Sequence, residues 1–305
     1  MRKELLSKIL RRYPFLSGCG TVANSKWVRS LAGDSKQEVW AKLENGLSVK
    51  CSLAEFGGRA VFYAGDTDRK LTKLLQIFLR PGDTVLDIGA NIGTTVLRSA
   101  HLVGPHGHVH AFEPNPAVQK TLKESVAFNG LENVTIHSVA VGDSPGELDL
   151  MVPIGHNGGA SLTRRDVEAT QATGTTMVKV PVRTVDDIFS TPAFEAIRLV
   201  KIDVEGFEPQ VIQGAYNLFR QVPPDVMVVE VNLCENLDQH PTVLALRDLG
   251  YQLFCIEKSY LNLKITKLEA GRTSFPGHDI LALRPGKVSP HILDQLSISA
   301  GSAFA

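Results

Sequence analysis

The stretch Val85-Leu86-Asp87-Ile88-Gly89-Ala90-Asn91-Ile92-Gly93 decides the fold. An apolar run that ends in a glycine-rich turn before a helical segment predicts a buried strand, a tight turn and the first residues of a helix. Glycine lets the backbone approach a ligand closely, and a helix amino terminus faces polar or anionic ligand groups. The stretch therefore predicts a nucleotide-type binding turn.

The spacing within this turn does not fit the dinucleotide fingerprint. Three residues separate Gly89 from Gly93, whereas the fingerprint reads Gly-x-Gly-x-x-Gly. Asp87 stands two residues before Gly89, where a carboxylate would repel a pyrophosphate. The same carboxylate suits the ammonium group of a methionine moiety, bound directly or through water.

A second polar position closes the next strand. Glu113 follows Val109-His110-Ala111-Phe112 and precedes Pro114. A carboxylate accepts two hydrogen bonds from vicinal ribose hydroxyls, and the end of the second strand is where a bound nucleoside places its ribose. Together with the first turn, Glu113 therefore predicts a nucleoside site.

Short β-branched runs alternate with helical segments through the middle of the chain. This alternation is typical of βαβ units and predicts an α/β fold with a doubly wound, mostly parallel sheet. The expected strands are Thr84–Ile88, His108–Phe112, Val134–Val139, Arg198–Ile202, Val226–Val231, Tyr251–Glu257 and Asp279–Leu283. The expected helices are Ile92–Val103, Pro116–Asn129, Pro209–Phe219 and Pro241–Leu249.

The alternation assigns residues 66–286 to one α/β domain and residues 1–65 to a separate amino-terminal segment. That segment has a basic amphipathic stretch over Lys3–Arg12, which predicts a short helix. It also contains Asn45-Gly46 between two alternating runs, which favours a β-hairpin with a type I′ turn and positive φ at both central residues.

Two further parts flank or interrupt the domain. Residues 146–189 form an insertion in which two strand-like pieces surround a loop rich in Gly, Thr and Ser. Such a loop at the carboxyl edge of a sheet can form a wall of the site. Residues 287–305 are rich in Ser, Ala and Gly, which predicts a flexible tail.

Composition excludes several classes of protein. The chain has 305 residues, of which 43% are hydrophobic, so it is neither disordered nor fibrous. Its 32 basic and 32 acidic residues cancel, which argues against nucleic acid as a bulk partner. The four cysteines lack Cys-x-x-Cys spacing, and no apolar run reaches the length of a membrane span. The expected location is the cytoplasm, with reduced thiols.

Three later motifs complete the predicted edge of the sheet. The turn Val139-Ala140-Val141-Gly142-Asp143 is placed so that its backbone and Asp143 flank an adenine ring. Asp203 and Glu205 follow the fourth strand and face the same cleft. Glu230 ends the fifth strand, where it either reaches the cleft or holds a neighbouring backbone amide.

In order and spacing, these motifs resemble the FkbM family of S-adenosylmethionine-dependent methyltransferases. The resemblance covers about residues 66–284. It rests on the stretch from Pro81 to Gly93, Phe112-Glu113-Pro114, Val139-Ala140-Val141-Gly142-Asp143, Arg183-Thr184-Val185-Asp186-Asp187 and Lys201-Ile202-Asp203-Val204-Glu205-Gly206.

The resemblance implies a seven-stranded class I methyltransferase sheet that binds S-adenosylmethionine at its carboxyl edge. It implies methyl transfer to an oxygen nucleophile of a small molecule or glycan, with no metal required. Asp203 and Glu205 would then lie next to the transferring methyl. The cofactor site would comprise Asp87, Gly89, Asn91 and Gly93 at the methionine end, Glu113 and Pro114 at the ribose, and Gly142 and Asp143 at the adenine.

Simpler roles exist for several of these residues. Asp87 and Glu113 could cap the helices that follow them, and Asp203 and Glu205 could be solvated turn residues. His156, in the loop of the insertion, is either a secondary general base or a plain polar residue. The remaining histidines lack metal-ligand spacing, so they favour surface or core roles. The basic helix either packs on its own domain or contacts a membrane or partner.

Two other functions compete with methyl transfer. A NAD-dependent oxidoreductase or epimerase would use the same fold class, but Gly-x-Gly-x-x-Gly and a Tyr-x-x-x-Lys pair are both missing. A scaffold protein that binds the cofactor without turnover is the third possibility, and the intact Asp203-Val204-Glu205 argues against it.

Overall fold

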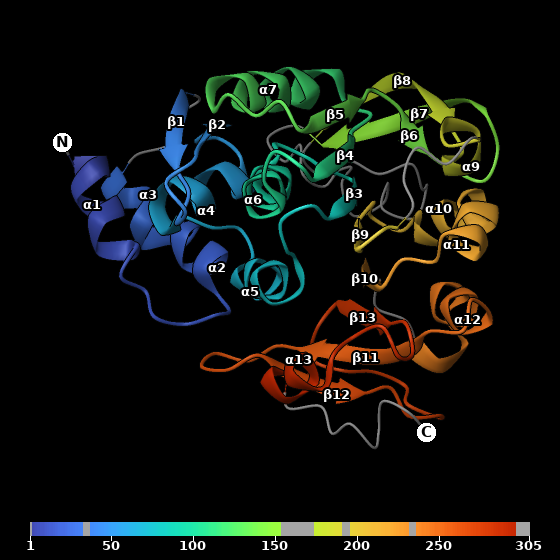
Figure 1. Cartoon of the computed structure of the whole chain (residues 1–305). Helices are drawn as coiled ribbons and strands as arrows, with labels where there is room; N and C mark the ends of the chain where they lie inside the picture. The colour runs from blue at the N-terminus through green and yellow to red at the C-terminus, as the bar shows by residue number, and fades with distance from the viewer. Residues whose placement is uncertain (1, 33–36, 154–173, 191–195, 232–235, 297–305) are drawn as a thin grey trace.

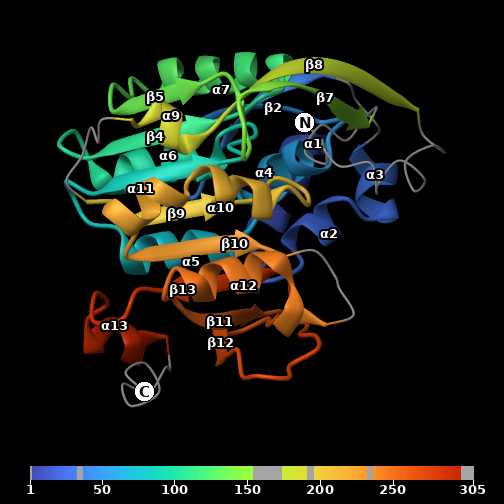
Figure 2. The ribbon, with the colours of Figure 1, turned by 90° about the vertical axis from the view of Figure 1, so that its right-hand side faces the viewer.

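The computed structural model describes residues 2–32, 37–153, 174–190, 196–231 and 236–296. A central eight-stranded sheet runs through the molecule in the order β12-β11-β13-β10-β9-β3-β4-β5 (Figures 1 and 2). Strands β10, β9, β3, β4 and β5 are parallel, while β13 is antiparallel to both β10 and β11. The predicted doubly wound, mostly parallel sheet is therefore confirmed.

The strands follow the sequence prediction closely. Their bounds are β3 Thr84–Ile88, β4 His108–Phe112, β5 Val134–His137, β9 Leu199–Ile202, β10 Val226–Glu230, β11 Gln252–Glu257 and β13 Asp279–Leu283. An eighth strand, β12 Lys264–Lys267, extends the seven that were predicted. This edge strand has only one buried apolar residue, Ile265, so it lacks the hydrophobic run that marks the others.

Helices cover both faces of the sheet (Figure 1). On one face lie α5 Arg69–Phe78, α6 Thr94–Val103, α7 Pro116–Phe128 and α13 Pro290–Gln295. On the other lie α9 Val185–Ile188, α10 Glu208–Gly214, α11 Tyr216–Gln221 and α12 Pro241–Asp248. Each face has its own hydrophobic cluster, and successive residues of β3 join opposite clusters, Val85 one and Leu86 the other. None of the described helices has the length and apolarity to cross a membrane.

The chain changes direction across the sheet between β3 and β9. From β3 it winds outward through β4 to β5, and the later strands β9 and β10 lie on the other side of β3. In open α/β sheets this switch point leaves a crevice outside the carboxyl ends of the strands, where ligands bind. The predicted site residues follow these strand ends.

The amino-terminal segment packs against the α5–α7 face of the sheet. Its helices are α1 Arg2–Leu10, α2 Cys19–Ala23, α3 Lys26–Ala32 and α4 Phe56–Ala64, and its hairpin pairs β1 Glu38–Lys42 with β2 Ser48–Ser52. Val49 and Cys51 of β2 belong to the same hydrophobic cluster as β3 and α6. The Ser125 hydroxyl of α7 accepts a hydrogen bond from the Lys50 amide at 3.0 Å.

The predicted hairpin is confirmed, but its turn type is wrong. Gly46 has φ of 84°, whereas Asn45 does not have positive φ, so the type I′ turn is not formed. Instead the Gly46 amide donates to the Leu43 carbonyl at 3.0 Å, and the Leu43 amide donates to the Leu47 carbonyl at 2.8 Å. Leu43 and Leu47 therefore close a loop of residues 44–46, which is one residue longer than the predicted turn, and Leu43 is buried in the hydrophobic cluster.

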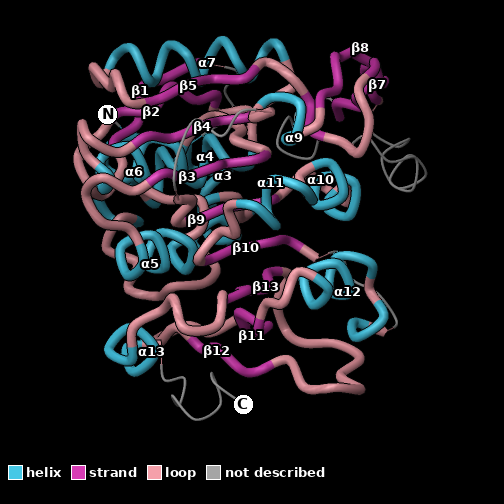
Figure 3. The backbone as a smooth tube through the Cα atoms, turned by 45° about the vertical axis from the view of Figure 1, so that its right-hand side comes forward, coloured by secondary structure: helices cyan, strands magenta, loops and turns pink. Residues whose placement is uncertain are grey.

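The insertion contains the two expected strands. Strands β7 Gly146–Pro153 and β8 Thr175–Arg183 pair antiparallel, and β8 also pairs with β6 Ala140–Val141. This small sheet lies beside the β4–β5 end of the central sheet (Figure 3). His156 falls in 154–173, outside the described residues.

The carboxy-terminal segment differs from the predicted flexible tail as far as residue 296. Helix α13 buries Ile292, Leu293 and Leu296 in the cluster beneath α5 and α6. These three side chains have the i, i+1, i+4 spacing of one helix face, which outweighs the small and polar residues around them. Residues 297–305 lie outside the described part of the chain.

Candidate active site

The glycines of the turn between β3 and α6 allow close packing within the protein, whereas the predicted close approach of this turn to a ligand stays a prediction. Gly89 has φ of 85°, and a Cβ added there would lie 1.9 Å from the Asp203 carbonyl oxygen, so only glycine fits. Gly93 has φ of 91° and begins α6, where an added Cβ would lie 2.3 Å from Leu122 of α7. Gly93 therefore packs helix against helix and does not line the cavities described below.

Asn91, in the same turn, adopts an unusual backbone conformation. Its φ is 51°, and among the described residues only Glu205 shares positive φ without being glycine. The left-handed region costs a side-chain-bearing residue free energy, and such strain tends to persist at functional sites. The Asn91 amide donates a 2.8 Å hydrogen bond to Glu113 Oε2, which ties the two predicted motifs together.

Glu113 is held in place by two backbone amides. Besides Asn91, the Asn115 amide donates to Glu113 Oε1 at 2.8 Å, and the side chain is 7% exposed. Burial raises the pKa of Glu113 to about 7, although both amides favour the charged form. Asn115 Oδ1, not Glu113, caps α7 by accepting from the Ala117 amide, so helix capping does not account for Glu113.

Asp87 is completely buried beneath the turn. Its Oδ1 lies 3.3 Å from Nζ of Lys201 on the neighbouring strand β9. Burial raises the pKa of Asp87, and the Lys201 ammonium opposes that shift. Asp87 does not line either cavity below, so its direct contact with a ligand ammonium stays a prediction.

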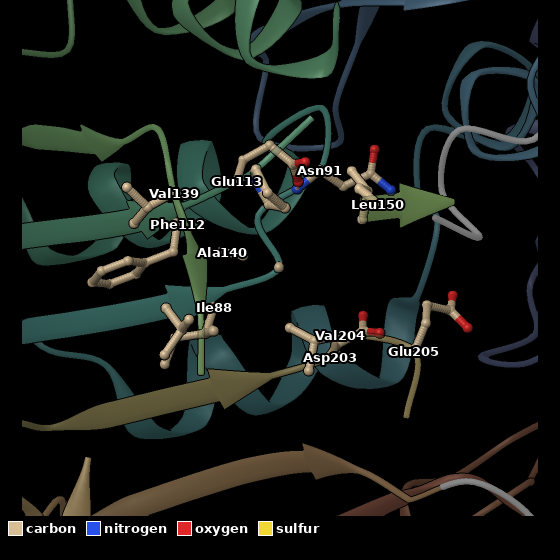
Figure 4. A pocket seen from close by; sticks show the side chains of 13 residues that line it. Ile88, Asn91, Phe112, Glu113, Val139, Ala140, Leu150, Asp203, Val204 and Glu205 are labelled. Atoms are coloured by element: carbon tan, nitrogen blue, oxygen red, sulfur yellow. Dashed lines mark hydrogen bonds between the residues drawn. The ribbon is translucent and has the colours of Figure 1, made fainter. Parts of the chain in front are cut away.

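A cavity opens between the first turn and the β9 loop (Figure 4). Ile88, Phe112 and Leu150 give it an apolar side. Figure 4 shows Glu113 and Asn91 on one side and Asp203 with Glu205 on the other. The remaining lining residues are Gly89, Pro114, Val139, Ala140, Val141 and Val204. An apolar slot with a few fixed carboxylates is typical of a nucleoside site.

Gly142 and Asp143 do not line this cavity, although the strand before them does. A Cβ on Gly142 would lie 2.8 Å from Val182 of β8, so this glycine serves packing. Asp143 is exposed, and its carboxylate accepts a hydrogen bond from the Ser144 hydroxyl. The structure thus brings Val139–Val141 rather than Asp143 to the cavity, and the contact of Asp143 with adenine stays a prediction.

Asp203 and Glu205 line the first cavity and also a second, larger one. Carboxylate oxygens of Asp203, Glu205 and Glu230 lie within 4.8 Å of one another. Among the described residues, no other group of three His, Cys, Asp or Glu side chains lies this close together. Burial, reinforced by the charges of Asp203 and Glu205, raises the pKa of Glu230 to about 10. The cluster therefore combines one carboxyl group whose burial and acidic neighbours favour its protonated form with two that line the cavities.

Glu208 holds the β9–α10 loop that carries Asp203 and Glu205. Glu208 Oε1 accepts hydrogen bonds from the Val204 and Gly206 amides, each at 3.1 Å. Glu205 has φ of 55°, so its side chain is held by a backbone conformation that glycine would adopt more easily. Glu205 is thus directed to the cavities at a local cost in stability.

The second cavity has a volume of about 450 Å³ and joins the first at the β3 and β9 turns. Gly89, Asn91, Asp203 and Glu205 line both cavities. The amino-terminal segment supplies much of the opposite wall, namely Glu38, Ser52, Glu55, Phe56, Gly57 and Gly58. Part of the wall of this cavity is therefore built by residues of the amino-terminal segment.

Sequence reasoning missed two of the residues that organise this edge. Lys201 is the one charged residue in the buried strand Leu199-Val200-Lys201-Ile202, and that mismatch was a usable signal. Glu208 looked like an ordinary acidic residue at a helix start, and only the structure shows that its carboxylate binds two loop amides.

The sequence matches the methyltransferase FkbM domain family over residues 87–253. It is 29% identical over 263 residues to the 31-O-demethyl-FK506 methyltransferase FkbM of Streptomyces tacrolimicus, covering 76% of this chain and 96% of that protein. It is 28% identical over 191 residues to the 2-O-methyltransferase NoeI of Sinorhizobium fredii, covering 58% of this chain and 76% of that protein.

Among solved structures, the fold resembles a methyltransferase FkbM from Methylobacillus flagellatus at 16% identity and a TM-score of 0.40. The matched region covers 70% of this chain and 50% of that one, so the chain spans half the length of that protein.

Proposed function

Because the chain belongs to the methyltransferase FkbM family and is an S-adenosylmethionine-dependent methyltransferase, we propose that it methylates a hydroxyl oxygen of a small molecule or glycan. The observation that carries this proposal is the pair Asp203 and Glu205, which line both cavities. Their carboxylate oxygens lie within 4.8 Å of a Glu230 oxygen, although Glu230 itself lines neither cavity. An alcohol must lose its proton as the oxygen–carbon bond forms, so an acceptor for that proton has to lie beside it.

The residues of the first cavity fit the cofactor. Glu113 is oriented by two amides and keeps further lone pairs for ribose hydroxyls. Ile88, Phe112 and Val139–Val141 offer apolar surface for an adenine ring. Gly89 lines the same cavity, and because it has no side chain its backbone packs directly against the Asp203 carbonyl at the proposed methionine end. Asn91 and Pro114 line the same space.

The bound cofactor supplies an electrophilic methyl group on a sulfonium. The protein then has to align the acceptor oxygen with that methyl and to receive the proton. In our proposal Asp203 or Glu205 receives it, because both line the two cavities where donor and acceptor would meet. His156 stays a secondary candidate for this role.

The second cavity is the proposed acceptor site. Its wall of amino-terminal residues, including Phe56 and Ser52, combines one aromatic side chain with polar groups, which suits a hydroxyl-bearing acceptor. The names of two relatives, the 31-O-demethyl-FK506 methyltransferase and the 2-O-methyltransferase, refer to O-methylation, which supports oxygen over nitrogen as the acceptor atom. We further propose that the protein works in the cytoplasm and that residues 66–286 form its catalytic domain.

Transfer from methyl-labelled S-adenosylmethionine tests this function. Purified protein is incubated with lysate fractions of the source cell and with panels of alcohols, oligosaccharides and amines, and labelled products are identified by mass spectrometry. We expect label as a methyl ether. Label on nitrogen would overturn the choice of acceptor, and cofactor binding without any turnover would favour the scaffold protein.

A calorimetric titration separates the remaining alternative. We expect S-adenosylhomocysteine to bind and NAD not to bind, because the first turn lacks the dinucleotide spacing. The opposite result would favour a nicotinamide-dependent enzyme.

A further inference from the structure

Lys201 is a buried cation in the middle of the sheet. It lies on β9, where Leu199, Val200 and Ile202 are all apolar and buried, and its own side chain is 8% exposed. A lysine at such a position loses hydration, which is costly unless opposite charges and hydrogen bonds replace the water. Its partners therefore show what it does.

The Lys201 ammonium contacts three groups from two strand ends. It donates a 2.6 Å hydrogen bond to the Gly89 carbonyl oxygen, in the turn that follows β3. Its Nζ lies 3.2 Å from Asp203 Oδ2 and 3.3 Å from Asp87 Oδ1. Asp87 and Lys201 are also register partners on the neighbouring strands β3 and β9.

The two acidic partners of Lys201 differ in their exposure to solvent. Burial lowers the pKa of Lys201, but Asp203 and Asp87 outweigh it and leave that pKa above its ordinary value, so the ammonium stays charged. Buried Asp87 serves as its internal counter-ion. Asp203 is 45% exposed and lines both cavities, so one of its oxygens is held by Lys201 while the carboxylate still reaches the reaction space.

The two turns that Lys201 joins are already in contact. The Asp203 amide donates to the Ile88 carbonyl at 3.1 Å, and Gly89 leaves no room for a Cβ against the Asp203 carbonyl. One turn carries the predicted methionine contacts, and the other carries the proposed proton acceptor. A single ammonium bonded to both fixes the position of the Asp203 carboxylate relative to the cofactor turn.

We propose that Lys201 is a positioning residue for methyl transfer, which orients the Asp203 carboxylate against the cofactor turn through its contacts with Gly89 and Asp203. This inference rests on the proposed function, because it gives Lys201 a role only through Asp203. Without the ammonium, the half-exposed Asp203 side chain would be free to turn toward solvent, and misplacement by about 1 Å can lower a rate about a hundredfold.

The test is a double-mutant cycle that avoids an unpaired buried charge. Lys201→Met alone would leave Asp87 uncompensated, so the cycle is built on Asp87→Asn, in which the buried acid is already neutral. Lys201→Met and Asp203→Asn are added to this background singly and together. Single-turnover methyl transfer is measured at saturating cofactor and acceptor, and S-adenosylhomocysteine affinity is measured by calorimetry as a check on folding.

We expect Lys201→Met to lower the transfer rate about 10- to 100-fold in the Asp87→Asn background, with S-adenosylhomocysteine affinity changed less than about threefold. In the background that also carries Asp203→Asn, the same substitution should change the rate less than about threefold, because the residue it positions is gone. Equal losses in both backgrounds would overturn the proposal, as would a loss of affinity that parallels the loss of rate.

Arg198→Met is the matched control. Arg198 immediately precedes β9 and also bridges neighbouring strand ends, but it does so at the opposite edge of the sheet. Its replacement should leave the transfer rate unchanged. If the unmutated protein methylates no hydroxyl acceptor, the proposed function fails; if it does and the cycle is additive, only the role of Lys201 fails.

Discussion

The two ends of strand β9 carry similar chemistry in different surroundings. At the amino end, Arg198 bridges Asp225 at 3.0 Å and Asp83 at 3.9 Å, and each of these acids keeps nearly a quarter of its side chain exposed. At the carboxyl end, Lys201 bridges Asp203 and Asp87, and Asp87 is fully buried. Both cations join neighbouring strands, but only the carboxyl end encloses a charge away from water.

Backbone strain follows the same division. The two described residues with positive φ that are not glycine, Asn91 and Glu205, both lie at the carboxyl end. At the amino end, Gly82 and Gly104 have open surroundings, where an added Cβ would meet nothing within 4 Å. Gly107 is packed more tightly, because an added Cβ there would lie 2.6 Å from the Asp83 carbonyl oxygen. Of the two ends of β9, the carboxyl end therefore has both the strained residues and the buried ion pair, and it is also the end that lines the cavities. Such local costs in stability are typical of functional sites.

The largest expected difference between the two ends is in the rate of methyl transfer. Asp203→Asn and Glu205→Gln keep side-chain shape and remove a charge, so the one that accepts the proton should lose about 10²–10⁴ in single-turnover rate. Asp225→Asn, at the amino end, should transfer at the unmutated rate. Unmutated rates in both carboxyl-end variants would make these acids structural turn residues.

The next difference is in stability. Asp87→Ala leaves Lys201 without its buried counter-ion and should lower the free energy of unfolding by about 3–5 kcal/mol. Asp225→Ala leaves Arg198 where water can reach it and should cost about 1 kcal/mol or less. Urea denaturation of both variants measures the contrast. Equal losses would contradict the distinction between the two ends.

We expect cofactor affinity to depend on the carboxyl end through Glu113. Glu113→Gln removes a charge-assisted acceptor of ribose hydroxyl bonds and should weaken S-adenosylhomocysteine binding by about 1.5–3 kcal/mol, about 10- to 100-fold. Calorimetry of the purified variant gives this directly. Asp83→Asn, at the amino end, is the control and should bind as the unmutated protein does.

The pH dependence of that binding has a defined sign. The pKa of Glu113 is raised by burial from 4.5 to about 7, so the folded protein without cofactor holds this proton more tightly than the unfolded chain does. Its contribution to stability is therefore present below about pH 4.5 and is lost as pH rises through about 7. Because ribose hydroxyls bind the carboxylate, affinity should rise as pH passes through about 7, and Glu113→Gln should remove that rise.

The smallest expected effect concerns the strained residue Glu205. Glu205→Gly relieves a left-handed conformation and should raise the free energy of unfolding by roughly 0.5–1 kcal/mol while lowering the transfer rate. Gly82→Ala at the amino end puts a side chain at φ of 92° and should lower the free energy of unfolding by roughly 1 kcal/mol. A Glu205→Gly variant that is less stable would show that this acid supports the loop.

Local sequence signals predicted the strands and most of their polar ends. The run Thr84–Ile88 before Gly89 is mostly apolar, so its strand follows from burial on both faces. The run His108–Phe112 before Glu113 instead alternates two half-buried histidines with buried apolar residues. Hairpin formation followed from Asn45-Gly46, but the turn type did not, because the hydrogen bonds close the loop at Leu43 and Leu47 and only Gly46 has positive φ. The packing of α13 depended in the same way on distant residues of the core.

The parts of the site that sequence reasoning missed are set by long-range packing. Lys201 acquires its role only when β9 lies next to β3, which brings Asp87 and Gly89 to its ammonium. The second cavity needs Phe56 and Glu38 of the amino-terminal segment to lie against the β3 and β9 turns. No local pattern in residues 1–65 encodes that contact.

Amide hydrogen exchange with and without S-adenosylhomocysteine tests the central claim most directly, namely that only the carboxyl end of the parallel sheet binds the cofactor. Ligand binding should slow exchange at the amides of 89–93, 113–115 and 203–206. Exchange at 81–83, 104–107 and 223–225, at the amino end, should not change. Protection confined to the amino end, or none at the carboxyl end despite saturating ligand, would contradict the account.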